Sequence, residues 1–166
     1  MTVKVTTVEQ FLVEELKDLY SAETQITKTL PKLVEAASSV ELKSAFEHHL
    51  KETEGHVERL EKAFKILGTS PRGETCDGMK GILAEGSEML HETPAGDIRD
   101  VVLISAAQRV EHYEMAVYGT VRTYAEELDR PDIAELLRQT LEEEKAADKK
   151  LTEISQKVNL HALRAA

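Results

Sequence analysis

The sequence contains no tryptophan and one cysteine, and aromatic residues make up only 4% of its 166 positions. A single cysteine excludes an internal disulfide framework, a CxxC redox pair and any metal site built from four thiolates. We therefore expect a protein of the reducing cytoplasm. The scarcity of aromatic residues, together with abundant Ala, Leu, Glu and Lys, favours helix over sheet. The composition thus predicts an all-α protein.

Basic residues are also in deficit, since 21 Lys and Arg stand against 31 Asp and Glu and give a formal net charge of −10. No basic cluster offsets this acidity, so we expect neither a nucleic-acid partner nor binding to an anionic membrane. No apolar stretch reaches transmembrane length, and residues 1–10 lack the basic start and apolar run of a signal peptide. We expect a cytoplasmic protein that forms a single domain over residues 1–166.

Apolar residues recur in steps of three and four through most of the chain, which is the spacing of amphipathic helices. Capping residues, glycines and prolines separate these periodic segments. The expected helices cover residues 7–36, 41–67, 74–92, 97–128 and 131–157. The third segment is short and rich in glycine, so we expect it to lie in a long crossover between two similar halves. The pattern predicts a four-helix bundle with this crossover, and an α-hairpin repeat is the alternative.

Acidic residues occur at mid-length in the apolar stripe, or beside it, on each of the four long helices. They are Glu23, Glu52, Glu114 and Glu144, of which Glu52 flanks its stripe. Unpaired carboxylates are costly in an apolar interior, and gathered carboxylates also repel one another. No Lys or Arg occupies a stripe position near these acids, so the sequence offers them no ion-pair partner. Divalent metal ions would supply the missing positive charge.

The second long helix can add nitrogen ligands to these carboxylates. His49 and His56 lie on its apolar stripe, and Glu52 lies three residues after the first and four before the second. Iron, manganese and zinc accept imidazole together with carboxylate ligands. Taken singly, a buried histidine is more often a hydrogen-bonded core residue, and an acidic run such as 142–144 is more often a solvated face. Acids at matching depth on all four helices instead favour a site for a pair of metal ions.

Four stretches carry a resemblance to a known family. They are Asp18–Gln25, His49–Leu60, Ala106–Glu114, which contains the motif Val-Glu-His-Tyr-Glu, and Thr140–Asp148. These stretches are similar to the YciF/YciE family of ferritin-like bacterial stress proteins, and the resemblance covers nearly the whole chain. It implies a ferritin-like bundle, a homodimer and a dinuclear metal site, without a firmly established reaction.

A more distant resemblance to the rubrerythrins implies metal ligands at matching positions. These positions are Glu23, His56, Glu111, Glu114 and Glu144. Thr53 stands where that family has a bridging glutamate, so Glu52 would have to rotate inward to replace it. Ala147 stands where the family has a histidine, which leaves Asp148 as the nearest substitute. The rubredoxin-like electron-transfer module is absent, because one cysteine cannot hold its iron.

Together these considerations imply a pair of metal ions per chain, with iron favoured and manganese second. The expected metal residues are Glu23, Glu52, His56, Glu111, Glu114, Glu144 and Asp148, with His49 and Glu143 as further candidates. Glu23 and Glu111 are expected to be terminal ligands on the two metals. Glu52 and Glu144 are expected to bridge them. The sequence leaves open which histidine of the second long helix provides the nitrogen ligand.

The expected reaction, if the protein is an enzyme, is the oxidation of Fe(II) by peroxide or oxygen. Glu114 could then enter the coordination sphere as the metals change oxidation state. Two alternatives remain open at this level. One is a non-catalytic stress protein in which the metal joins two helical hairpins, and the other is a mini-ferritin that stores iron in a hollow cage.

Overall fold

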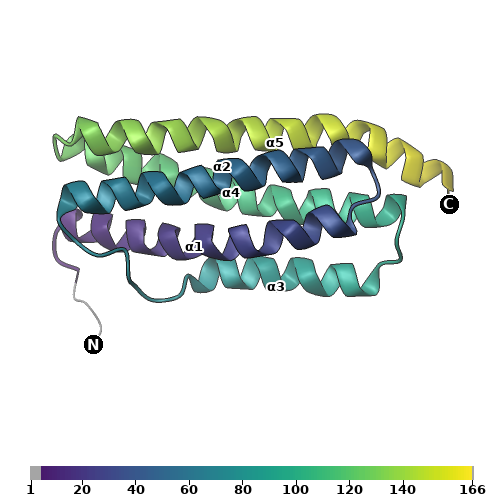
Figure 1. Ribbon diagram of the computed structural model, residues 1–166, viewed down its shortest axis with the longest axis horizontal. Coiled ribbons are helices and arrows are strands. Elements are labelled where there is room, and N and C mark those ends of the chain that lie inside the picture. The colour runs from purple at the N-terminus through teal and green to yellow at the C-terminus, as the bar shows by residue number, and fades with distance from the viewer. Residues whose placement is uncertain (1–4, 166) are drawn as a thin grey trace.

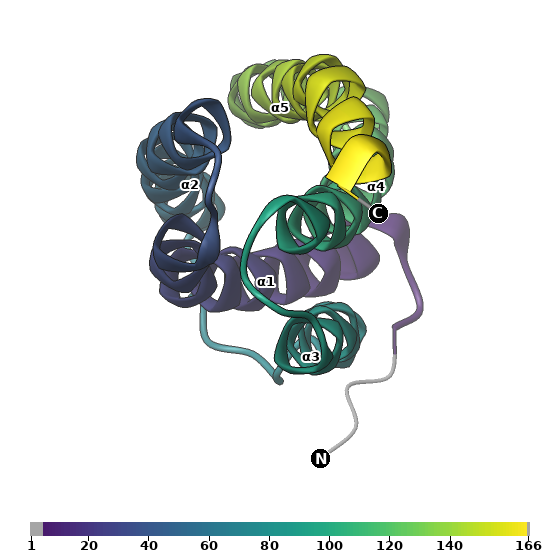
Figure 2. The ribbon, with the colours of Figure 1, turned by 90° about the vertical axis from the view of Figure 1, so that its right-hand side faces the viewer.

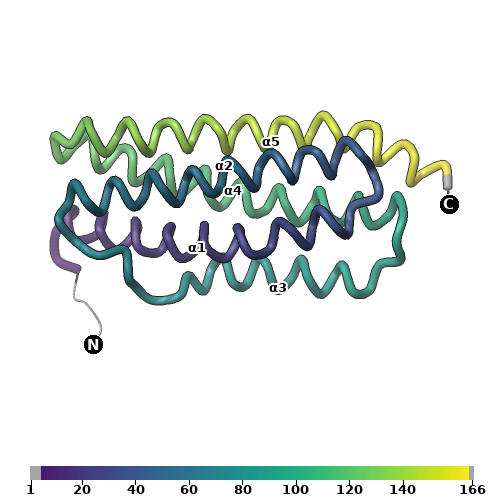
Figure 3. Tube along the Cα trace, viewed as in Figure 1, coloured from purple at the N-terminus to yellow at the C-terminus, as the bar shows by residue number. Residues whose placement is uncertain are grey.

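The computed structural model describes residues 5–165, and its regular secondary structure within them is entirely helical. The helices are α1 (Val8–Ala36), α2 (Val40–Leu67), α3 (Asp77–Glu92), α4 (Asp97–Glu127) and α5 (Pro131–Ala165). Four long helices lie alongside one another, and the shorter α3 lies outside them against α1 and α4 (Figures 1 and 2). The tube in Figure 3 shows that α1 and α5 run in one direction while α2 and α4 run in the other. The predicted all-α bundle, with a short helix in its crossover, is confirmed.

Local sequence signals explain most of the helix ends. Thr7 caps α1 by accepting a hydrogen bond from a backbone amide of the first turn. Gly68 ends α2 in the left-handed conformation, with a φ of 65°. The cap of α2 is Ser39, whose side chain accepts a hydrogen bond from the amide of Leu42. Pro31 lies inside α1, and the helix continues past it to its last turn.

Two helix ends differ clearly from the predicted ones. The third helix begins at Asp77 instead of residue 74. The last helix continues to Ala165 instead of ending near residue 157, and Val158 is buried beyond the predicted end. The cap position of α4 is Gly96, which makes no side-chain bond. The buried Asp100, in the first turn of α4, instead binds backbone amides at the start of α2.

Asp100 accepts hydrogen bonds from two backbone amides of the α1–α2 connection. Its oxygens lie 2.8 Å from the nitrogen of Ser38 and 2.7 Å from that of Ser39. These amides precede the first turn of α2 and have no partner within that helix. The contact therefore fixes the α1–α2 corner against the start of α4.

Two apolar clusters fill the bundle, one on each side of its middle. The first includes Ile26, Phe46 and Leu103. The second includes Leu16 and Phe64. None of the helices within residues 5–165 combines the length and the apolarity needed to cross a membrane.

Candidate metal centre

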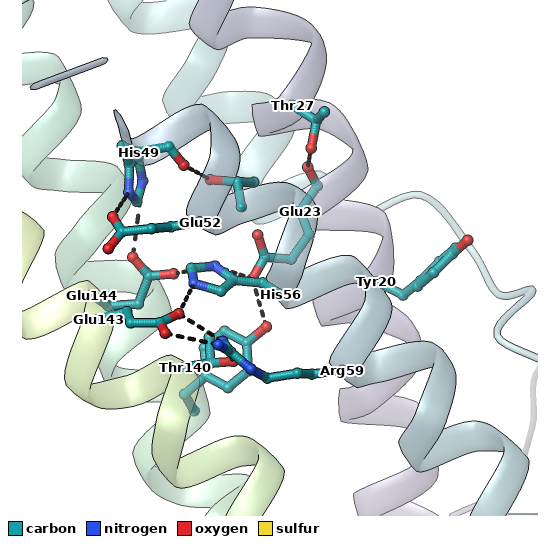
Figure 4. Close-up of polar contacts among 12 residues, drawn as sticks. Tyr20, Glu23, Thr27, His49, Glu52, His56, Arg59, Thr140, Glu143 and Glu144 are labelled. Carbon is teal, nitrogen blue, oxygen red and sulfur yellow. Dashed lines mark hydrogen bonds and ion pairs between the residues drawn. The ribbon is translucent and has the colours of Figure 1, made fainter. Parts of the chain in front are cut away.

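Six buried polar side chains separate the two apolar clusters at the middle of the bundle. They are Glu23 of α1, His49 and His56 of α2, Glu111 and Glu114 of α4, and Glu144 of α5. None of the six exposes more than 6% of its surface. Figure 4 shows the labelled members of this set, which point toward one another from their separate helices.

The potential ligand atoms of these side chains fall into two groups, each spanning no more than 4.8 Å. One group consists of His49, Glu111, Glu114 and Glu144, and the other of Glu23, His56 and Glu144. Glu144 therefore belongs to both. A carboxylate with one oxygen directed to each group has the position required to bridge a pair of metal ions.

The histidines approach the carboxylates closely without forming aligned hydrogen bonds to them. His56 Nδ1 lies 2.9 Å from Glu144 Oε1 and 3.3 Å from Glu23 Oε1. His49 Nε2 lies 3.2 Å from Glu111 Oε1. Neither of these nitrogens has a hydrogen-bond partner, although the distances would permit one. These ring nitrogens and carboxylate oxygens therefore lie around shared space at the middle of the bundle.

Unsatisfied buried atoms provide a test of whether these residues fit metal ions. Both oxygens of Glu114 and both of Glu144 lack a hydrogen-bond partner, and so does one oxygen each of Glu23 and Glu111. A buried polar atom without a partner costs about 1–3 kcal/mol, and more if it is charged. Such a concentration of unsatisfied atoms at one place is explained if cations coordinate them. The residues therefore fit a pair of metal ions.

The donor set also has the composition of known dinuclear centres in helical bundles. Ferritin-like carboxylate proteins use a Glu from each of two helices and a Glu-x-x-His motif from each of the other two, which makes four carboxylates and two imidazoles. The same numbers occur here, but both histidines come from α2. The helix that lacks a histidine has Ala147 at the third position after Glu144.

Burial and mutual repulsion dominate the electrostatics of this cluster. Burial raises the pKa of Glu114 well above its usual range, and the charges of Glu144 and Glu23 raise it further. Burial likewise raises the pKa of Glu144 to about 7, although contact with His56 opposes this rise. For His56, burial lowers the pKa, but the charge of Glu23 and contact with Glu144 outweigh it and bring the value to about 10. Without metal, the centre therefore holds protons that an incoming cation would displace.

Glu143 lies outside both ligand groups and orients one of the histidines. Its carboxylate accepts hydrogen bonds of 2.6 and 2.7 Å from the guanidinium of Arg59. The same carboxylate lies 2.9 Å from His56 Nε2, which leaves Nδ1 directed into the centre (Figure 4). Arg59 lies beside the apolar stripe of α2 rather than on it, and the sequence did not indicate that it pairs with Glu143. The hydrogen bonds of Arg59 at the edge of the centre go to Glu143 and Thr140 and not to the six buried residues.

The remaining two expected ligands lie outside both ligand groups. Glu52 is partly exposed and contacts the histidines of its own helix, 3.2 Å from His48 and 3.6 Å from His49 Nδ1. Thr53 takes the inward position instead and is 1% exposed. Consecutive residues on a helix point about 100° apart, so a shift of one position turns a carboxylate out of the interior.

Asp148 is the other expected ligand that the structure leaves outside both groups. One of its oxygens lies 3.1 Å from the side-chain nitrogen Nε2 of Gln108 and 3.3 Å from Nε2 of His112. Asp148 therefore connects α5 to the outer face of α4.

Tyr118 is a member of the centre that the sequence did not reveal. Its side chain is fully buried, and its hydroxyl donates a short hydrogen bond to Glu23 Oε1. From the sequence, we placed Val117, three residues after Glu114, on the apolar stripe of this helix instead. The spacing of Glu111, Glu114 and Tyr118 is i, i+3, i+7, which was the available signal for an inward-facing tyrosine.

The bundle, its crossover and its central carboxylates and histidines define a ferritin-like helical protein. In fold it matches a structure of ferritin-like, diiron-carboxylate proteins from Bacillus anthracis, with a TM-score of 0.69 and 18% sequence identity. That match covers 90% of this chain and 99% of the other. The expected ferritin-like fold is confirmed.

The family follows from the sequence itself. Residues 7–163 match a family described as a domain of unknown function, DUF892. The chain is also 43% identical to protein YciF of Escherichia coli K12 over 150 residues, which is 90% of each protein. This chain belongs to that family, and the expected relationship to YciF is confirmed.

Solved structures of relatives agree closely with this assignment. The crystal structure of the E. coli stress protein YciF matches with a TM-score of 0.89 and 42% identity, over 93% of this chain and 98% of that one. YcfI of Rhodopseudomonas palustris, described as a candidate structural protein, matches with a TM-score of 0.88 and 41% identity. That alignment covers 92% of this chain and 97% of the other.

Proposed function

We propose that this protein binds a pair of metal ions at the centre of its bundle, with iron preferred and manganese second. The observation that carries the proposal is the position of Glu144, whose carboxylate belongs to both groups of ligand atoms. A carboxylate and imidazole donor set suits both metals. The unsatisfied oxygens of Glu114 and Glu144 support the proposal independently.

The proposed ligands divide between two positions. Glu23 and His56 hold one ion, while His49 and Glu111 hold the other. Glu144 bridges the two positions, and Glu114 belongs with the second. Glu52 and Asp148 are not assigned as ligands, because their contacts lie outside both groups.

The proposed reaction is the oxidation of Fe(II) by peroxide or oxygen in a cell under stress. Iron bound at the centre would supply the electrons that reduce the oxidant. The chain contributes carboxylates that can change between terminal and bridging positions, and Tyr118 holds the Glu23 carboxylate in place through its hydrogen bond. The apolar cluster that includes Leu16 and Phe64 excludes water on one side of the centre.

Anaerobic loading with Fe(II), followed by desalting and elemental analysis, tests the metal claim. We expect about two iron ions per chain for the parent, as a dinuclear centre requires. The Glu23→Ala/Glu144→Ala double variant should retain almost none. Asp148→Ala is the matched control and should load like the parent, because Asp148 contacts α4 and not the centre. Loading of the double variant to the parent level would overturn the proposal.

A structural role for the metal is the second candidate, favoured by the description of YcfI as a candidate structural protein. In this case the protein is a non-catalytic homodimer, and metal holds the helices together. The Glu114→Ala/Glu144→Ala variant distinguishes the two roles. The structural role is favoured if this variant oxidises Fe(II) with peroxide as fast as the parent but, after incubation with iron, melts at a lower temperature. Loss of the oxidation would favour the catalytic one.

The storage alternative makes a different prediction about size. A mini-ferritin needs a cage of many chains, whereas the proposed protein is a homodimer. Sedimentation velocity of the purified protein separates these possibilities directly. A dimer would exclude the storage role. A large closed assembly would contradict the proposed homodimer and favour storage.

A further inference from the structure

A cavity of about 840 Å³ extends from the centre through one half of the bundle. This volume lies within the range of roughly 300–1,000 Å³ that is typical of small-molecule sites. The α2 wall of the cavity runs from Val40 to Glu52, which corresponds to about 18 Å of helix at 1.5 Å per residue. The cavity is therefore long enough for an extended molecule.

Small side chains on two neighbouring helices create this space. Ser44 and Ala45 line it from α2, and Ala146 and Ala147 line it from α5. These two helices are neighbours on one side of the bundle (Figure 2). Longer side chains at these positions would close the space between the two helices, as they do in a filled core.

The inner walls of the cavity are aliphatic. Leu30 of α1, Val110 of α4 and Leu151 of α5 represent this lining. At the outer rim, Glu41 pairs with Lys150 at 3.1 Å and also with Lys157 at 2.9 Å. The walls favour an apolar chain, and both of these lysines are already engaged by Glu41.

The inner end of the cavity is the metal centre itself. Of the six centre residues, only His49 and Glu111 expose any surface, at 6% and 2%, and both line the cavity. The other four are fully buried and are absent from its walls. A molecule in the cavity thus reaches the centre from the His49 side.

We propose that the cavity binds an extended aliphatic molecule with one neutral oxygen-bearing head group, an alcohol or an aldehyde, directed toward His49 and Glu111. The proposal deepens the proposed function, because it names the class of molecule that is brought to the centre. The binding itself requires no metal. A carboxylate head is disfavoured, because two carboxylates, Glu52 and Glu111, face one imidazole, His49, at the inner end.

Calorimetric titration of the metal-free protein with octanol tests the proposal. We expect one saturable site per chain, and octanoate should bind at least about tenfold more weakly because its charge meets the acidic end. Ala147→Phe places a ring into the cavity from α5, and Ala45→Phe places one from α2. Each should weaken octanol binding by about tenfold or more, because the ring occupies the space that the chain needs.

The matched control is Ala116→Phe, an exposed alanine of α4 outside the cavity, which should bind octanol like the parent. Circular dichroism checks that each variant keeps its helices. Three results would overturn the proposal: no saturable binding to the parent, equal loss in the control, or tighter binding of octanoate than of octanol. If Ala147→Phe dissociates a dimer and the parent does not bind octanol, the cavity is covered by a second copy and the proposal fails.

Iron loading of the same variants separates this proposal from the proposed function. Octanol binding without any iron retention would leave the cavity as a binding site and remove the dinuclear centre. Iron retention by an Ala147→Phe variant that no longer binds octanol would support both.

Discussion

Glu143 accepts two hydrogen bonds from the Arg59 guanidinium and lies 2.9 Å from His56 Nε2. One carboxylate from α5 therefore fixes a cation and an imidazole from α2 at the same time. The ring of His56 is held with Nδ1 toward Glu23 and Glu144. Such outer partners of a ligating histidine set its tautomer and its orientation.

This relationship predicts the effect of Glu143→Gln on metal affinity. An amide cannot accept both bonds from Arg59 and also hold His56, so the ring loses its fixed orientation. We expect metal binding to weaken by about 10–100-fold, the usual effect of losing an outer partner. Competition with a chelator of known affinity measures the change. Glu142→Gln is the control, since Glu142 is exposed and pairs with Lys145, and it should bind metal like the parent.

Tyr118→Phe should destabilise the metal-free protein. The hydroxyl of Tyr118 is the donor that satisfies one oxygen of the buried Glu23, and its removal leaves that oxygen without a partner. The expected loss is about 1–3 kcal/mol in the free energy of unfolding, measured by urea denaturation. Tyr20→Phe removes a hydroxyl bonded to Glu61 at the surface and should cost less. An equal loss in the two variants would contradict the role assigned to Tyr118.

Glu114→Gln should raise the melting temperature of the metal-free protein but reduce the stability that the protein gains from Fe(II). Burial and the charges of Glu144 and Glu23 raise the pKa of Glu114, so its ionised form is unfavourable in the metal-free protein. The neutral amide avoids the cost of protonating this carboxyl on folding, and we expect a higher melting temperature without metal at neutral pH. With Fe(II) bound, the parent should gain more stability than the variant, because the variant has lost an anionic ligand. A lower melting temperature of the variant in both states would contradict this account.

Periodicity in the sequence was sufficient for the bundle and for part of the centre. Glu23, His56 and Glu144 lie on regular apolar stripes, so their inward direction follows from helical spacing alone. In α4 a step of three from Glu114 led the predicted stripe to Val117, whereas a step of four reaches the buried Tyr118. A shift of one residue rotates a side chain by about 100°, which is enough to miss a buried tyrosine.

Contacts between segments that are distant in the sequence could not be predicted from local sequence patterns. Asp100 binds the amides of Ser38 and Ser39 across more than sixty residues of sequence, and no spacing rule indicates that pairing. The pairing of Arg59 with Glu143 could not be predicted for a similar reason, because the two residues are on different helices. The cavity likewise depends on alanines of two helices that only the fold brings together.

The measurement that tests the central claim most directly is the iron content of single-residue variants after anaerobic loading. Because Glu144 is shared by both groups of ligand atoms, Glu144→Ala should lose both ions, whereas Glu23→Ala should lose one and retain about one per chain. The parent should retain about two. A Glu144→Ala variant that retains as much iron as the parent would contradict the shared carboxylate and, with it, the dinuclear centre.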